Sequence, residues 1–229
     1  FDEKPLTSVL EERLGHRVFI ENDSRAMTYG EYMYGVGNGE RDMVFLNLSW
    51  GFGIGMILGG ELHYGKSGFS GEYGHFPFFD NEIICSCGKR GCLETEVSGW
   101  AAHRQFVEKL SQGNISILSK QYESGQQITV ADILDALAKE DMLAIEVMEQ
   151  IGISLGRGIA GLINMFNPEV VVLGGTLCEA KDYLLLPIKA AINKYALNFV
   201  SKDTAIKVSK LGEQAGLIGI CAITRNKML

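Results

Sequence analysis

Apolar residues recur along the chain with the two spacings typical of helices and strands. Helical patterns cover residues 6–15, 24–34, 94–110, 130–139, 142–166, 183–196 and 214–224. Short apolar runs predict strands at residues 17–20, 43–49, 169–173 and 206–211, and a hairpin of residues 56–58 and 61–64 around Gly59-Gly60. Residues 50–55 are expected to form a glycine turn. Because strands and helices alternate and the central strands are apolar throughout, we expect an α/β fold with a covered sheet.

Two local signals refine the helices. Thr129-Val130-Ala131-Asp132 has the form of a capping box that opens the helix at residues 130–139. In the long helix, Gly152, Gly156 and Ala160 recur every four residues, which predicts that a second helix or strand lies very close to it. Asn167-Pro168 is expected to end that helix, because proline cannot continue it.

Composition excludes several classes of protein. The 229 residues are 46% hydrophobic and 21% charged, which is typical of a globular chain. We expect no membrane span, because no apolar run reaches about 18 residues without a charge or a glycine. The formal net charge of −7 argues against this segment itself binding a phosphate backbone. The first residues do not resemble a signal peptide, and a cytoplasmic location is expected.

Cysteine spacing gives the strongest chemical signal. Of five cysteines, three lie close together as Cys85, Cys87 and Cys92, and His75 precedes them. Three thiolates and one imidazole match the four-ligand tetrahedral site of structural zinc. Such a closed site leaves no position for water, so it is expected to shape a loop and not to catalyse hydrolysis. The alternative is three buried free cysteines and an unrelated histidine.

The region around these cysteines resembles a family signature. Gly71-Glu72-Tyr73-Gly74-His75, followed by Cys85-x-Cys87-Gly88-x-x-Gly91-Cys92-Leu93-Glu94, is similar to the motif of the ROK family (repressor, open reading frame, kinase). Its members are bacterial sugar kinases and sugar-responsive transcriptional regulators. The resemblance continues at residues 21–23, 51–55, 170–175 and 211–213, so it covers nearly the whole chain.

The resemblance implies an actin-like ATPase, ribonuclease H-like fold of two lobes around a cleft, with an N-terminal lobe that is incomplete in this chain. Residues 1–40 would be the remainder of that lobe. Residues 41–212 would be the large C-terminal lobe, including a zinc loop at 75–92. Residues 213–229 would form a final helix that returns to the first lobe.

The resemblance also implies a sugar site. Family members hold a hexose with residues that correspond here to Asn22, Asp23, Glu72, His75 and Glu94. These side chains suit a ring of hydroxyls, because a carboxylate accepts from two hydroxyls and an amide both donates and accepts. In a kinase, Asp23 would act as general base toward the attacking hydroxyl. His75 is expected to use one ring nitrogen for zinc and the other for the sugar.

Simpler interpretations of the same residues remain open. Asn22-Asp23 also has the form of a helix N-cap before residues 24–34. Glu72 and Glu94 could be surface carboxylates, as most glutamates are. Glu94 could also serve only the dipole of the helix that it opens.

The signals for a nucleotide are weak. Gly51 and Gly53 match the place of a family phosphate loop, and Gly174 and Gly175 match its adenosine-side turn. Family kinases usually carry Gly-Thr-Gly, whereas Phe52 stands here between the two glycines and offers no hydroxyl. The Asp-x-Gly-x-Thr loop with which such kinases begin is not found in the sequence.

Two functions are therefore predicted as alternatives. The preferred one is the sugar-binding effector domain of a ROK-type transcriptional repressor, in which lobe closure on a hexose or hexose derivative signals to a DNA-binding domain outside this chain. The other is an ATP-dependent, glucokinase-like hexose kinase that requires magnesium. Structural zinc and homo-oligomer formation are expected in both cases.

Overall fold

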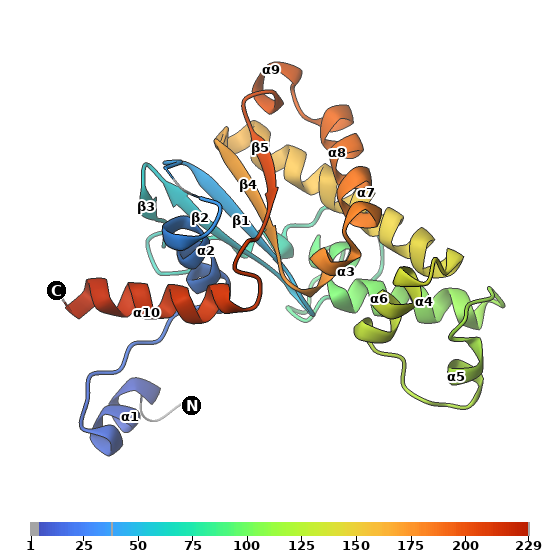
Figure 1. Ribbon diagram of the computed structural model, residues 1–229, viewed down its shortest axis with the longest axis horizontal. Helices are drawn as coiled ribbons and strands as arrows, with labels where there is room; N and C mark the ends of the chain where they lie inside the picture. Colours follow the sequence, from blue (N-terminus) through green and yellow to red (C-terminus); the bar gives the residue numbers. More distant parts are fainter. Residues whose placement is uncertain (1–4, 38, 229) are drawn as a thin grey trace.

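A computed structural model describes residues 5–37 and 39–228. At its centre is a mixed five-stranded sheet of order β3-β2-β1-β4-β5 (Figure 1). The strands are β1 (Met43–Leu48), β2 (Phe52–Leu58), β3 (Glu61–Leu62), β4 (Val170–Gly174) and β5 (Ala205–Val208). β1, β4 and β5 run parallel, whereas β1, β2 and β3 form an antiparallel meander. The meander includes the predicted hairpin at Gly59-Gly60.

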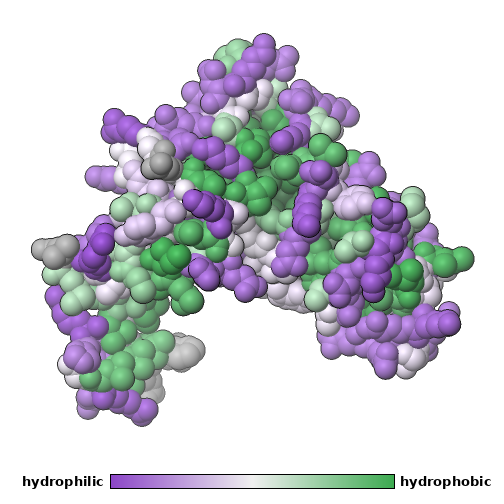
Figure 2. Space-filling model, in the orientation of Figure 1, coloured by the Kyte–Doolittle hydropathy of each residue, from purple (hydrophilic) through white to green (hydrophobic). Residues whose placement is uncertain are grey.

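Helices surround this sheet and also extend beyond it. They are α1 (Leu6–Leu14), α2 (Asp23–Tyr34), α3 (Glu94–Val97), α4 (Gly99–Ser111), α5 (Ser119–Glu123), α6 (Val130–Ala138), α7 (Met142–Phe166), α8 (Asp182–Tyr195), α9 (Asn198–Ser201) and α10 (Gln214–Met228), with 3-10 helices η1 (Glu72–His75) and η2 (Thr176–Ala180). No described helix has the length and apolar character needed to cross a membrane. α1 buries no residue of its own, and Figure 2 shows hydrophobic surface on it.

The two faces of β1 belong to different apolar clusters. Val44, Leu46 and Leu48 face the larger core, which includes residues of α4, α6 and α7. Met43 and Phe45 point the other way and pack with residues of α2. Successive side chains of a strand point to opposite faces, so a strand with apolar side chains on both faces requires cover on both. The prediction of a covered sheet is confirmed.

Two helix pairs pack with unusually short separations. A Cβ on Gly156 of α7 would lie 2.5 Å from the Ile188 carbonyl oxygen of α8, which confirms the contact predicted from the four-residue repeat. α10 lies against α2 in the same manner, because a Cβ on Gly30 or Gly219 would collide with the backbone of the facing helix. Small residues at both crossings therefore let the helix backbones approach directly.

Three predicted elements are wrong in detail. Residues 17–20 form no strand: Ile20 is 53% exposed, and the three apolar residues after Arg17 are too few to show whether a partner strand exists. The glycine turn predicted at 50–55 is shorter, because β2 already begins at Phe52. The single helix predicted at 94–110 is two helices, α3 and α4. Ser98 separates them in extended backbone and caps α4 by accepting from the Ala101 N–H.

Candidate functional site

A cavity of about 360 Å³ lies beyond the carboxyl end of β1, where the first turn of α2, the β1–β2 turn and η1 meet. Its lining includes all of the side chains predicted to hold a sugar: Asn22, Asp23, Glu72, His75 and Glu94. In open α/β sheets ligands bind outside the carboxyl ends of the strands, so this is an expected place for a binding site. The lining is predominantly polar and acidic, which suits a ligand with several hydroxyl groups.

The start of α2 contributes the first two of these residues. Asn22 is the N-cap, and its Oδ1 accepts from the Arg25 N–H at 3.1 Å. The capping interpretation is thus correct for Asn22, but capping uses only the amide oxygen and leaves Nδ2 available at the cavity. Asp23 Oδ1 accepts from the Ser24 N–H at 2.6 Å. Both side chains are exposed, so these two residues can begin α2 and still offer polar groups to a ligand in the cavity.

A chain of hydrogen bonds supports Asp23 from beneath. The Ser49 hydroxyl donates to Asn47 Oδ1 at 2.7 Å, and Asn47 Nδ2 donates to the Ser24 hydroxyl at 3.2 Å. The Ser24 hydroxyl in turn donates to Asp23 Oδ1 at 3.2 Å. We call these residues the Ser49–Asp23 chain. It fixes the carboxylate orientation from the end of β1, and Ser24, Asn47 and Ser49 also line the cavity.

The Ser49–Asp23 chain of hydrogen bonds was not predicted from the sequence, although Asn47 gives one signal of it. Asn47 interrupts a run of apolar residues in β1, and it is only 7% exposed. A buried amide within an apolar strand requires hydrogen-bond partners and therefore indicates a polar site nearby.

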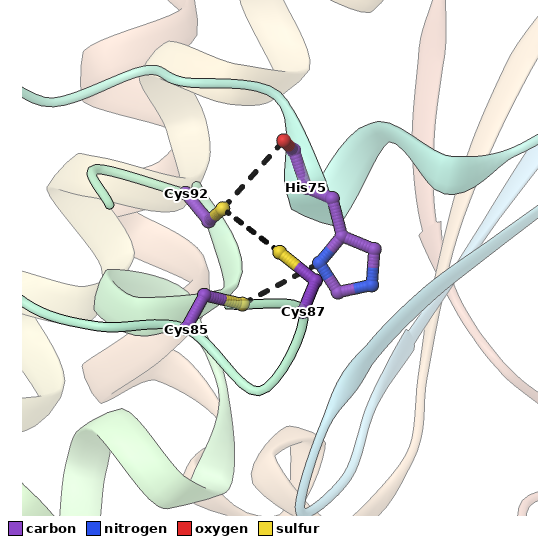
Figure 3. A group of neighbouring side chains, drawn as sticks. All are labelled: His75, Cys85, Cys87 and Cys92. Atoms are coloured by element: carbon purple, nitrogen blue, oxygen red, sulfur yellow. Dashed lines mark hydrogen bonds between the residues drawn. The ribbon is translucent and has the colours of Figure 1, made fainter. Parts of the chain in front are cut away.

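The second feature is a cluster of potential metal ligands. One ligand atom each from His75, Cys85, Cys87 and Cys92 lie within 4.8 Å of one another (Figure 3). Cys85 Sγ is 3.5 Å from His75 Nδ1, and Cys87 Sγ is 3.7 Å from Cys92 Sγ. A tetrahedral zinc with Zn–S bonds of about 2.3 Å holds its sulfur atoms about 3.8 Å apart. The donor set and its spacing therefore fit a bound metal ion.

Burial divides the thiols of this cluster. Cys85 and Cys92 are buried, whereas Cys87 is exposed, and none of them is in a disulfide. Burial, together with the adjacent Cys87 and Cys85, raises the pKa of the Cys92 thiol to about 12 in the metal-free chain. A buried thiol of this kind becomes a thiolate when a cation supplies the compensating charge.

His75 and Glu94 join the cysteine cluster to the cavity. His75 turns Nδ1 toward the thiols, while its Nε2 lies 3.7 Å from Glu72 Oε2 in the cavity. Glu94 Oε2 accepts from the Phe52 N–H at 3.2 Å, and its Oε1 accepts from the Ser86 hydroxyl at 3.2 Å. Glu94 is half-buried and is therefore not a free surface carboxylate. The metal loop and the cavity share these two side chains.

The glycines predicted to contact a nucleotide fall in two places. Gly51 and Gly53 line the cavity described above, whereas Gly174 and Gly175 line a second cavity of about 460 Å³. Ser49 borders both. Packing alone also explains a glycine at position 53, because a Cβ there would collide with the Ser24 side chain. Nucleotide binding at these four glycines stays a prediction.

Comparison with known proteins shows the family of the chain. The ROK family profile matches residues 1–227. The chain belongs to the ROK family. The glucokinase of Halalkalibacterium halodurans is 35% identical over 216 residues, which are 94% of this chain and 66% of that enzyme. The chain thus spans just under two thirds of the length of this relative.

Solved structures of ROK proteins include both functional classes. A ROK family transcriptional regulator, a homologue of the Escherichia coli MLC protein, superimposes with a TM-score of 0.85 and 32% identity, over 96% of this chain and 55% of that one. The ROK glucokinase from Streptomyces griseus, in complex with glucose and AMPPNP, gives a TM-score of 0.88 and 28% identity, over 97% and 73%. These neighbours confirm the actin-like ATPase, ribonuclease H-like fold predicted from the motifs.

Proposed function

We propose that this chain binds a hexose or hexose derivative in the cavity between α2 and η1, as the effector region of a ROK-type transcriptional repressor. The observation that carries sugar binding is the convergence of Asn22, Asp23, Glu72, His75 and Glu94, far apart in sequence, on one polar cavity. The Streptomyces griseus glucokinase, which has the same fold, was solved with glucose. DNA binding would belong to a region outside residues 1–229.

The β1–β2 turn favours a sensor over a kinase. A phosphate loop needs free N–H groups and hydroxyls that point at the phosphates. Here the Phe52 N–H already donates to Glu94, and the Phe52 side chain is buried in the core. The exposed Trp50 side chain stands at this turn and adds bulk where a nucleotide phosphate would approach.

A hexose kinase is the alternative function, and one observation favours it. The second cavity, lined by Gly174 and Gly175, lies next to Ser49 and so adjoins the proposed sugar site. ATP bound there with magnesium would supply a phosphoryl group to a sugar hydroxyl. The Ser49–Asp23 chain orients the Asp23 carboxylate, which would accept the proton of that hydroxyl.

Calorimetric titration of hexoses tests the sugar site. We expect Asp23→Asn and Glu94→Gln to weaken binding at least roughly tenfold, because each removes a charged hydrogen-bond acceptor. Glu149→Gln serves as the matched control, since Glu149 is an exposed carboxylate on α7 away from the cavity. Equal affinities in all three variants would exclude this cavity as the site.

A coupled assay with ATP, magnesium and the same hexoses separates sensor from kinase. The sensor proposal expects no turnover above background. Turnover in the wild-type chain that disappears in Asp23→Asn would replace the sensor with the kinase. The assay should be repeated with the longer protein if this chain is part of one, because the chain spans only part of its relatives.

Zinc is the metal favoured by the His75 and cysteine donor set. A tetrahedral ion with three thiolates and one imidazole is closed to water, so the role proposed for it is structural. It would hold residues 75–92 against η1 and keep His75 Nδ1 occupied, leaving Nε2 as the donor toward a ligand. Metal analysis of freshly purified protein should give one zinc per chain, and its absence would contradict the proposal.

The position of α10 supports the proposed division into lobes. α10 packs on α2, so residues 213–229 and 1–40 would form one unit and residues 41–212 the other. Closure between the two units on a sugar would then be the signal of the sensor. We also infer that the protein forms a homo-oligomer, and a sedimentation mass of one chain at micromolar concentration would contradict this.

A further inference from the structure

A third cavity, of about 590 Å³, adjoins the proposed sugar site, and Glu94 lines both. Its lining includes Trp50, Trp100, Ile84 and Ser86, and most of its surface is apolar. It shares Trp50, Gly51 and Glu94 with the sugar cavity, so the two spaces are neighbours. The chain has two tryptophans, and both border this cavity. The proposed function, which concerns the sugar cavity, leaves it without a role.

The walls of this cavity are held in place by backbone contacts. The Gly99 N–H donates to the Ser49 carbonyl at 2.7 Å and the Trp100 N–H to the Trp50 carbonyl at 2.9 Å, so the start of α4 anchors the turn that carries Trp50. The Trp50 ring lies 6.0 Å from the ring of His103 on α4. The Arg104 guanidinium lies 5.6 Å from the Trp100 ring. A preformed wall of this kind costs little entropy when a ligand binds.

Two large apolar side chains are nevertheless open to solvent at this wall. Trp50 is 59% exposed and Ile84 is 61% exposed. Exposed indole beside a polar binding cavity is a typical ligand-binding surface, because it offers a flat apolar face with little conformational freedom. The C–H face of a pyranose ring matches such a surface.

Polar groups at the junction fit the rim of the same ring. Glu94 places one carboxylate oxygen toward each side: Oε2 contacts the Phe52 N–H at the sugar cavity, and Oε1 contacts the Ser86 hydroxyl at the third cavity. These acceptors and the Ser86 hydroxyl could bind ring hydroxyls on both sides of a glycosidic bond. Among the residues that the structure describes, Glu94 is the charged side chain of this lining and no lysine or arginine belongs to it, which disfavours a sugar phosphate.

We propose that the third cavity is a subsite for a second pyranose ring, so that the ligand of this protein is a disaccharide with one ring in each cavity. The inference rests on the proposed sugar site, because it uses that cavity for the first ring. Trp50 and Trp100 would stack on or flank the second ring, and Glu94 would bind near the linkage. The large Trp50 side chain, which disfavours a phosphate loop, would then serve to contact the second sugar ring.

Intrinsic fluorescence provides a direct test, since both tryptophans of the chain report on this cavity. Titrations would compare glucose, xylose and N-acetylglucosamine with maltose, cellobiose, lactose, trehalose and sucrose. We expect at least one disaccharide to bind roughly tenfold more tightly than its component hexose and to change the emission more strongly. Calorimetry would provide the affinities independently of the fluorophores.

Variants show whether the third cavity binds the second ring of a disaccharide. Trp100→Leu and Ile84→Ala alter only the third cavity, and they should reduce disaccharide affinity roughly tenfold while hexose affinity stays within about twofold. If one of the two variants does not fold, the other still tests the subsite. Unchanged hexose affinity shows that a variant is folded. Hexose binding with no gain for any disaccharide would overturn the subsite alone. If neither hexoses nor disaccharides bind, the proposed sugar site itself is wrong.

Discussion

The Ser49–Asp23 chain makes a quantitative prediction about Asn47. Asn47→Ala removes two hydrogen bonds of a side chain that is 7% exposed, one from the Ser49 hydroxyl and one to the Ser24 hydroxyl. Each such bond contributes about 1 kcal/mol net to stability, so the substitution should lower the free energy of unfolding by about 2 kcal/mol. Ser49→Ala removes only the first bond and should cost about 1 kcal/mol.

The double variant tests whether the two residues act through one bond. Because the Ser49–Asn47 bond is lost in either single variant, Asn47→Ala with Ser49→Ala should cost about 2 kcal/mol and not the additive value of about 3 kcal/mol. Urea unfolding followed by far-ultraviolet circular dichroism measures all four proteins, with the denaturant slope as a check that the unfolded state is unchanged.

Sugar affinity gives the functional half of this prediction. Without Asn47, the Ser24 hydroxyl loses the donor that orients it, and Asp23 loses part of its fixed geometry. We expect Asn47→Ala to weaken hexose binding by roughly fivefold, equivalent to about 1 kcal/mol. Strictly additive stabilities together with wild-type sugar affinity in Asn47→Ala would refute the reasoning.

Three further predictions concern other parts of the molecule. Cys92→Ser should remove the metal, increase protease cleavage within residues 71–94 and weaken hexose binding; wild-type affinity in this variant would show that the metal loop and the cavity are independent. Gly156→Leu should destabilise the protein by about 3 kcal/mol, since even a Cβ there lies 2.5 Å from the facing Ile188 carbonyl, and a thermal midpoint equal to wild type would contradict the α7–α8 contact. Burial alone would raise the pKa of Glu21, but hydrogen bonds from the Arg25 side chain and the Asn22 N–H outweigh it and lower the pKa below the usual 4.5. The stabilisation from Glu21 is therefore fully present above pH 4.5, and it is lost as the pH falls through the lower pKa of the folded state. In that acidic range the free energy of unfolding of Glu21→Gln should depend less on pH than that of wild type, and unfolding measured at a series of pH values tests this.

The sequence predicts best where the chemistry is local. His75 and the three cysteines lie within eighteen positions of one another, and a metal site needs only their side-chain types and short spacing. The long helix and its partner were predictable as well, because a four-residue repeat of small residues marks one helix face. The capping box of α6 is local in the same sense and is confirmed.

Features that depend on distant contacts were not predictable in this way. The support of Asp23 by Asn47 exists only because α2 packs on β1 and β2, and no local pattern gives that packing. The sequence wrongly predicts a strand at residues 17–20, because a run of only three apolar residues after Arg17 cannot reveal that no described strand pairs with it. Ser98-Gly99 breaks the predicted helix because Gly99 lies against the Ser49 carbonyl, a contact fifty positions away.

The contact of α10 with α2 has a mechanical consequence. Where Gly30 and Gly219 bring the two backbones together, no flexible side chain separates them that could absorb a small shift. Asn22 and Asp23 lie at the start of α2, about one turn before Ala26, whose carbonyl oxygen faces Gly219 of α10. We therefore expect a displacement of α10 to shift the start of α2, and with it Asn22 and Asp23 of the proposed sugar site, and we expect a ligand bound there to act on α10 through the same contact.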